Sequence, residues 1–119
     1  MRKIKTYYHV TFVNRFSKIL EYGIIPGKPT IWMNRYGRRL GNKKVIYAHA
    51  DYETAFRWAF KQAWDFKKQP VIISFKEYTD EMIPHVNLLG MEEYTKEGKI
   101  EPEQIVDVFD PIEEQVWNR

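Results

Sequence analysis

A stretch of twenty residues near the N-terminus, positions 7–26, constrains the fold of this chain most strongly. Its first part alternates apolar and polar residues with the period of two that a strand shows, Tyr8, Val10 and Phe12 against His9 and Thr11. We therefore expect His9 near the end of a strand, just before the next element begins. Side chains at such ends often contact ligands, which makes His9 a candidate site residue.

The second part of this stretch has helical spacing and a stop signal. Apolar residues recur there at intervals of three and four, as on one face of a helix: Phe16, Ile19 and Leu20. The helix is expected over about residues 14–22. Gly23 can adopt the positive φ that commonly ends a helix, and Pro26 prevents its continuation. The stretch thus predicts a strand, a short helix and a defined exit.

The order of the remaining elements predicts the fold class. A strand at 45–49 precedes Asp51, a typical N-cap, and an amphipathic helix over 52–66. Further strands are expected at 30–33, 71–75, 93–95 and 105–109, an extended segment at 83–89, a turn at 77–82, and a long basic loop at 34–44. Two helices followed by several strands favour an α+β fold with a largely antiparallel sheet. The length of 119 residues predicts a single domain, 1–119.

The composition excludes several classes of protein. The chain has no cysteine, which rules out a disulfide framework, a thiolate nucleophile and thiolate metal sites. No apolar run of about 18 residues or more is present, so no membrane span is expected, and the basic N-terminus lacks the apolar run of a signal peptide. We expect a monomeric protein of the cytoplasm.

Charge is distributed unevenly along the chain. Residues 1–44 contain eleven basic side chains and one acidic side chain, whereas residues 45–119 contain eight basic and fifteen acidic ones. Such asymmetry favours an anionic ligand near the first half, either a dinucleotide phosphate or a nucleic acid. The alternative is that the two halves neutralise each other across one compact surface.

Three separated segments carry a family resemblance. The first is Tyr8-His9-Val10-Thr11 followed by Gly23-Ile24-Ile25-Pro26, the second is Val45-Ile46-Tyr47-Ala48 followed by Asp51 and 55–58, and the third is Glu93-Tyr94 followed by Ile100, Pro102-Glu103 and Ile105. In this order they resemble the ADP-ribosyltransferase superfamily, in the His-Tyr-Glu branch of poly(ADP-ribose) polymerases, diphtheria toxin and DarT-type enzymes. The resemblance spans roughly residues 7–108. It implies a compact fold with a split, mainly antiparallel sheet and two main helices, and NAD as co-substrate.

The resemblance also implies roles for individual residues. The triad falls on His9, Tyr47 and Glu93. His9 would hydrogen-bond the ribose next to the nicotinamide, Tyr47 would stack on the nicotinamide ring, and Glu93 would support the positive charge as the glycosidic bond breaks. The main chain at Val10 would hold the carboxamide, and Trp58 would supply a second aromatic ring.

Three further residues are expected among the NAD contacts: Thr11, and Arg38 and Arg39 of the basic loop, because arginines and glycines can wrap phosphates. A carboxylate suits this chemistry because cleavage of the glycosidic bond passes through an oxocarbenium-like state, which a nearby negative charge stabilises. No metal is needed for such a reaction.

Two features leave alternatives within this assignment. The family usually has glycine directly after the histidine, where this chain has Val10. Three other glutamates compete with Glu93 for the role of catalytic acid: Glu92, Glu101 and Glu103. His49 and His85 lack carboxylates at metal-ligand spacing and are expected to be structural or surface groups.

Three functions are compatible with the sequence. The first is transfer of ADP-ribose to a macromolecular acceptor, DNA, RNA or protein, chosen by a short loop near residues 88–92. The second is an RNA 2′-phosphotransferase, a reaction on the same fold that would need Arg15, Arg38 and Arg39 around a phosphate. The third is a catalytically degenerate relative that only binds nucleic acid or a protein.

Overall fold

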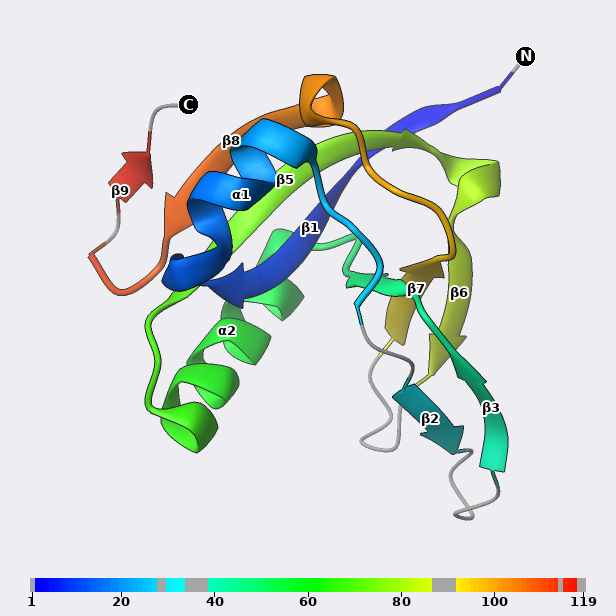
Figure 1. Ribbon diagram of the computed structural model, residues 1–119, viewed down its shortest axis with the longest axis horizontal. Coiled ribbons are helices and arrows are strands. Elements are labelled where there is room, and N and C mark those ends of the chain that lie inside the picture. The colour runs from blue at the N-terminus through cyan, green and yellow to red at the C-terminus, as the bar shows by residue number, and fades with distance from the viewer. Residues whose placement is uncertain (1, 28–29, 34–38, 87–91, 114, 118–119) are drawn as a thin grey trace.

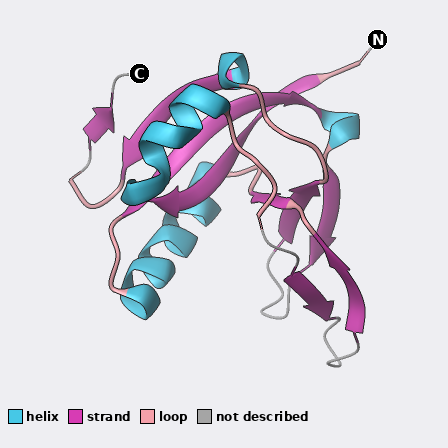
Figure 2. Ribbon diagram, in the orientation of Figure 1, coloured by secondary structure: helices cyan, strands magenta, loops and turns pink. Residues whose placement is uncertain are grey.

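The computed structural model of the chain describes residues 2–27, 30–33, 39–86, 92–113 and 115–117 (Figure 1). Its elements are two α-helices and antiparallel strands arranged in separate sheets (Figure 2). Every strand pairing between described residues is antiparallel. The prediction of a compact α+β fold with a mainly antiparallel sheet and two main helices is therefore confirmed.

The strands form a main sheet, a smaller sheet and a hairpin. The main sheet has the order β1-β5-β8-β9, with β1 at Ile4–Phe12, β5 at Pro70–Tyr78, β8 at Ile105–Asp110 and β9 at Gln115–Trp117. The smaller sheet has the order β4-β7-β6, with β4 at Ile46–Ala48, β7 at Glu92–Lys96 and β6 at Ile83–Val86. The hairpin pairs β2 (Thr30–Met33) with β3 (Arg39–Lys43), and Figure 1 shows it extending away from the main sheet.

The two helices pack on opposite faces of the main sheet. Helix α1 (Phe16–Tyr22), which follows a 3₁₀ turn at Val13–Arg15, contributes Ile19 to the larger core cluster. Helix α2 (Tyr52–Phe66) covers the other face through a smaller cluster, in which Ala55 and Ala59 meet Ile72. None of the described helices is long and apolar enough to cross a membrane.

Helix α2 has the predicted bounds, and helix α1 ends at the predicted residue but begins at Phe16 rather than near residue 14. The Asp51 carboxylate caps α2 by accepting a hydrogen bond from the Thr54 N–H at 3.1 Å. At the end of α1, Gly23 has φ +86, and a Cβ there would lie only 2.1 Å from the carbonyl oxygen of Ile100. Glycine is therefore required at this position. It lets Ile24 exchange two backbone hydrogen bonds of 2.9 Å with Ile100.

Two predicted boundaries were wrong, and one strand was not predicted. Residues 39–43 form a strand rather than part of a long loop, because they pair with β2 in a hairpin. Strand β5 continues through Tyr78, so the expected turn at 77–82 is reduced to a 3₁₀ turn at Thr79–Glu81. The strand at Ile105–Asp110 is followed by β9, which pairs with it. In each case the segment lacks alternating hydrophobicity of its own and is held by its neighbour.

A β-bridge between Tyr8 and His49 joins the two sheets. The N–H and carbonyl of Tyr8 each form a 2.8 Å hydrogen bond with the main chain of His49, directly after β4. On its other side, β1 pairs with β5 along its whole length, from Ile4 opposite Tyr78 to Phe12 opposite Pro70. The two sheets therefore diverge beyond Tyr8, and the residues that follow on β1 lie at the opening.

Candidate active site

A pocket of about 380 Å³ lies where the two sheets diverge. Its walls come from β1, β4, α2 and β7, and its lining residues are His9, Val10, Tyr47, His49, Trp58, Gln62 and Glu93. Five of these seven are residues that the sequence analysis expected in a site. Ionisable and aromatic side chains from segments far apart in the chain thus lie together in one pocket.

His9 directly follows Tyr8, whose main chain bonds to His49 just after β4. Its Nδ1 lies 2.7 Å from the carbonyl oxygen of Tyr47. A carbonyl oxygen can only accept, so Nδ1 carries the hydrogen and donates it. In the neutral imidazole this leaves Nε2 as an acceptor. The side chain of His9 thus joins β1 to the main chain of β4.

The charge state of His9 is set by its surroundings. Burial lowers the pKa of His9, the hydrogen bond to the Tyr47 carbonyl opposes that effect, and the nearby His49 and Arg15 lower the pKa further. The net shift is downward from the ordinary value of 6.5. His9 is therefore uncharged at neutral pH.

Val10 occupies the position where the resembling family usually has glycine. Its side chain packs into the cluster under α2, against Ala55, Ala59 and Ile72. Main-chain direction alternates along a strand, so the N–H and carbonyl of Val10 point the same way as those of Tyr8, toward the opening between the sheets. The valine side chain is thus used for packing, and its main chain faces the pocket.

The aromatic residues of the pocket come from β4 and α2. Tyr47 is half-buried in the middle of β4, and Trp58 is half-buried on α2. Gln62 lies one helical turn after Trp58, on the same face of the helix, and also lines the pocket. The sequence analysis missed Gln62, although its spacing of four from Trp58 is a signal that could have identified it.

Glu93 is the glutamate that the structure places in the pocket. It lies in β7 and is only 8% exposed. The competing glutamates lie elsewhere. The exposed Glu92 accepts a hydrogen bond from the Tyr94 hydroxyl at 2.9 Å, Glu101 caps a 3₁₀ turn, and Glu103 lines a different cavity. Location therefore favours Glu93 over all three alternatives.

His49 was expected to be structural or on the surface, and it lies instead in the pocket wall. It is 4% exposed, and its ring centroid is 6.5 Å from that of Trp58. Among the described residues, its Nδ1 has no hydrogen-bond partner. Its position two residues after Tyr47, on the same side of an extended segment, is the signal that could have identified it.

The pKa of His49 is also lowered from its ordinary value. Burial is the largest cause, and it outweighs the Glu93 carboxylate, the Glu92 main chain and Asp51, which all act to raise the pKa. An uncharged imidazole therefore lies close to a buried carboxylate in one pocket. Perturbed ionisable groups of this kind are concentrated at functional sites, although ion-pair networks also produce them.

A second cavity of about 470 Å³ shares His9 with the pocket. It lies between β1 and α1 and contains Thr11, Arg15 and Lys18. Thr11, expected among the cofactor contacts, is therefore next to the pocket rather than in its wall. Arg15 and Lys18 provide two cationic groups for an anion there.

The expected contributions of Arg38 and Arg39 are not located by the structure. Arg38 lies outside the described residues, and Arg39 is described only by its backbone position at the start of β3. The loop expected to choose the acceptor, near residues 88–92, is described only at Glu92. Within the described residues, no group of three or more His, Asp or Glu side chains could hold a metal ion.

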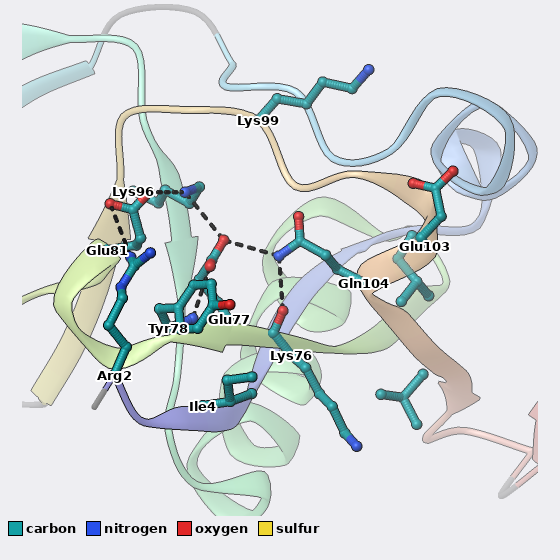
Figure 3. Close-up of a pocket in the computed structure, with 12 residues that line it drawn as sticks. Arg2, Ile4, Lys76, Glu77, Tyr78, Glu81, Lys96, Lys99, Glu103 and Gln104 are labelled. Carbon is teal, nitrogen blue, oxygen red and sulfur yellow. Dashed lines mark hydrogen bonds and ion pairs between the residues drawn. The ribbon is translucent and has the colours of Figure 1, made fainter.

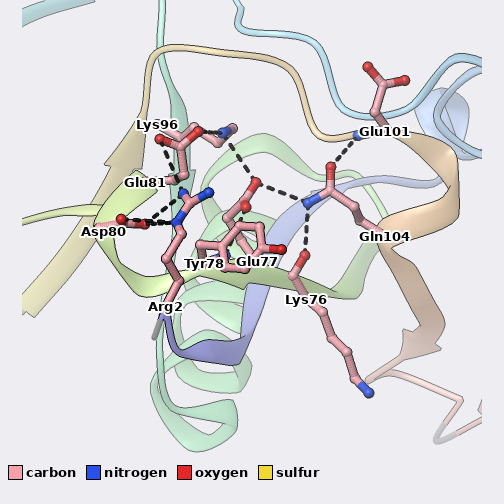
Figure 4. A network of polar contacts seen from close by, with 9 residues as sticks. All are labelled: Arg2, Lys76, Glu77, Tyr78, Asp80, Glu81, Lys96, Glu101 and Gln104. Atoms are coloured by element: carbon pink, nitrogen blue, oxygen red, sulfur yellow. Dashed lines mark hydrogen bonds and ion pairs between the residues drawn. The ribbon is translucent and has the colours of Figure 1, made fainter.

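A third cavity, of about 650 Å³, lies at the other end of β1 (Figure 3). Its polar side chains are bonded to one another: Lys96 Nζ lies 3.1 Å from a Glu77 oxygen, and Gln104 Nε2 donates to the same oxygen at 2.9 Å (Figure 4). This network holds β5, β7 and the 3₁₀ turn at Pro102–Gln104 together. We assign it to stability rather than to ligand binding.

Comparisons of the chain with protein-family models, with curated proteins and with solved structures gave no match. A functional assignment therefore depends on the geometry of the pocket and on the resemblance of its residues.

Proposed function

We propose that this protein is an NAD-dependent ADP-ribosyltransferase, which cleaves the bond between nicotinamide and ribose and transfers ADP-ribose to a macromolecule. One observation carries the proposal: His9, Tyr47 and Glu93 come from three different strands and line a single pocket, together with Trp58 from α2. In this set, Tyr47 and Trp58 can hold the nicotinamide ring, His9 can bond to the ribose, and Glu93 can stabilise the developing positive charge.

Each residue has a role in the proposed reaction. Tyr47 and Trp58 hold the nicotinamide ring by aromatic contact, and the outward main chain of Val10 binds its carboxamide. The acceptor Nε2 of His9 takes a hydrogen bond from a ribose hydroxyl. The glycosidic carbon–nitrogen bond breaks with both electrons leaving on nicotinamide. The acceptor nucleophile then bonds to the same ribose carbon and loses its proton.

Electrostatics in the pocket suit an intermediate that carries positive charge on the ribose. The carboxylate of Glu93 is shielded from water, so its attraction for the developing charge is stronger than it would be at the surface. His9 and His49 are uncharged at neutral pH because their pKa values are lowered mainly by burial, and they therefore do not repel that charge. The pocket thus combines one negative group with neutral hydrogen-bonding groups.

The sizes of the cavities also fit a dinucleotide. The pocket has a volume typical of a small-molecule site, and the second cavity extends it past His9. Arg15 and Lys18 in that cavity provide positive charge for the phosphates. The same two cations favour a second candidate, NAD-dependent removal of a 2′-phosphate from RNA, which would need the phosphate to bind beside His9.

The test is release of nicotinamide from NAD by the purified protein. Glu93→Gln removes the negative charge with little change in shape, and we expect it to lower turnover roughly 100-fold or more. The matched control is Glu92→Gln, which alters the adjacent exposed carboxylate on the same strand and should leave turnover unchanged. Circular dichroism checks that both variants are folded.

Three other outcomes would contradict the proposal. Equal turnover by Glu93→Gln and Glu92→Gln would exclude Glu93 as the catalytic acid. Removal of phosphate from a 2′-phosphorylated RNA, without ADP-ribose transfer to other acceptors, would favour the phosphotransferase. Failure to bind NAD in calorimetric titration would leave the protein as a non-catalytic binding module.

A further inference from the structure

The outer side of α2 carries aromatic side chains that the core does not use. Trp64 is 76% exposed and Phe60 is 42% exposed, and the Phe60 ring centroid lies 4.8 Å from that of Phe56. These three residues are spaced by four along one flank of the helix, from Phe56, which packs against the core cluster under α2, outward to the exposed Trp64. Exposed aromatic rings that gather in one patch can mark an interaction site, whereas single exposed apolar residues need no such explanation.

Lysine ammonium groups lie over aromatic rings at the end of this helix. Lys67 Nζ is 4.6 Å from the centroid of the Trp64 ring, and Lys68 Nζ is 5.4 Å from the centroid of the Phe12 ring. Both distances are within the range of cation–π contacts. Phe12 ends β1, so the surface continues from α2 to the edge of the main sheet. We call these residues the aromatic–lysine surface: Phe12, Phe60, Trp64, Lys67 and Lys68.

The charge balance of this region is positive. The acidic side chains within α2 are Glu53 and Asp65, and each is neutralised on the helix: Glu53 by Arg57 at 2.7 Å and Asp65 by Lys61 at 2.8 Å. Among the described residues, neither Lys67 nor Lys68 forms an ion pair, so the aromatic–lysine surface keeps both positive charges.

We propose that the aromatic–lysine surface binds single-stranded nucleic acid, with a base stacked on Trp64 and the neighbouring phosphates paired with Lys67 and Lys68. Exposed rings interleaved with cations are the two components that such binding needs, because every base has a flat face and every nucleotide has a phosphate. A duplex hides its bases within the stack, which favours a single strand over a double one. The inference does not depend on NAD chemistry.

The position of this surface connects it to the cationic cavity beside the pocket. Arg15 follows Phe12 by three residues in the chain and, with Lys18, lines the cavity that contains His9. A strand bound along Trp64 and Phe12 would have to pass the end of β1 to reach Arg15, on the other face of the main sheet. Such a path is required if the bound strand is also the acceptor of the proposed transfer.

The test is binding of a fluorescein-labelled oligothymidylate, measured by anisotropy in the absence of NAD. We expect Trp64→Ala to weaken binding roughly tenfold and Trp64→Phe, which keeps a flat ring, to retain most of the affinity. The double variant Lys67→Gln/Lys68→Gln should reduce the dependence of log K on log salt by about 1.4, the value for two lost phosphate contacts.

A second double variant controls for the change in net charge. Lys76→Gln/Lys99→Gln removes two lysines that line the cavity at the other end of β1, and it should change the salt dependence far less. Absence of oligothymidylate binding at low salt would overturn the proposal, as would equal affinities of Trp64→Ala and the native protein. Nicotinamide release by the same preparations separates these outcomes from failure of the proposed enzyme function.

Discussion

Strand β7 carries two buried charged residues whose surroundings differ. Lys96 lies in a network where each charge has partners, whereas Glu93, three residues earlier, lines the candidate active-site pocket. The two regions lie toward opposite ends of β1. Both contain buried ionisable groups, and burial shifts the pKa of groups in each.

In the network, both side-chain oxygens of Glu77 and both side-chain polar atoms of Gln104 have partners. One carboxylate oxygen of Glu77 accepts from Gln104 and pairs with Lys96, and the other accepts from the Tyr78 N–H at 2.8 Å. Gln104 Nε2 also donates to the Lys76 carbonyl at 2.8 Å, and its Oε1 accepts from the Glu101 N–H at 2.9 Å. Such satisfaction is what stability requires of buried polar groups.

In the pocket, by contrast, one buried polar atom of the described residues has no hydrogen-bond partner. This atom is the Nδ1 of His49. Leaving a buried polar atom unpaired costs about 1–3 kcal/mol. The other such atom in the described residues, Thr95 Oγ1, lies outside the pocket, so the feature particular to this region is an unpaired nitrogen close to a buried carboxylate. The difference between the two regions therefore separates a structural cluster from a candidate site.

The largest expected effect comes from breaking the network. In Lys96→Met, Glu77 keeps its charge but loses its cationic partner, and we expect the free energy of unfolding to fall by about 3 kcal/mol, measured by urea denaturation. The pocket residues are unchanged, so NAD turnover per folded molecule should remain that of the native protein.

A double variant shows whether the loss arises from an unpaired charge. Glu77→Gln/Lys96→Met removes both charges and leaves an amide that can still bond with Gln104, so it should be less destabilised than Lys96→Met alone. If the single variant is no less stable than the double one, the network does not have the role we assign to it.

The second effect is smaller. His49→Phe keeps a ring beside Trp58 but removes both the unpaired Nδ1 and the hydrogen bond to the Glu92 main chain, so we expect stability to change by less than about 1 kcal/mol. NAD turnover should fall, because the pocket loses a polar group. The measurements are thermal unfolding and nicotinamide release.

Thr95→Val is the matched control for this prediction. The hydroxyl of Thr95 is the other buried side-chain atom without a partner in the described part of the chain, and Thr95 does not line the pocket. Removing this hydroxyl should raise stability and leave turnover unchanged. A loss of stability in His49→Phe comparable to that of Lys96→Met would place His49 among the structural groups.

The sequence predicted best those parts of the fold that depend on local signals. The Asp51 cap and the helix that follows it, the glycine exit at Gly23 and the strand around His9 each follow from a few neighbouring residues. Strand β3 was missed because its residues have no apolar alternation and are ordered by pairing with β2. Contacts of that kind are not visible in one segment alone.

The site shows the same division. His9, Tyr47, Trp58 and Glu93 were named because their segments resemble a family in order and spacing, and the structure brings all four to one pocket. His49 and Gln62 were missed because neither belongs to a quoted motif. Whether these two residues line the pocket depends on where β4 ends beside β1 and on which face of α2 lies toward the pocket. Both are features of the tertiary structure.

The smallest expected effect is a difference in pH dependence between the two regions. The pKa values of His9 and His49 are lowered from 6.5, mainly by burial, so the unfolded chain binds protons more readily than the folded one. Their contribution to stability is complete above pH 6.5 and is lost as the pH falls below it. Burial tends to raise the pKa of Glu77, but hydrogen bonds from Gln104, the Tyr78 N–H and Lys96 lower it overall from 4.5.

The network should therefore lose stability in a lower pH window than the pocket. The contribution of Glu77 is complete above pH 4.5 and is lost as the pH falls further. Urea unfolding measured across both windows should show two declines. Substituting both pocket histidines, His9→Asn with His49→Phe, should flatten the upper decline, and Glu77→Gln should reduce the lower one without abolishing it, because Asp51 and Asp80 also have lowered pKa values. An upper decline that survives the loss of both histidines would show that their burial is not what couples the pocket to pH.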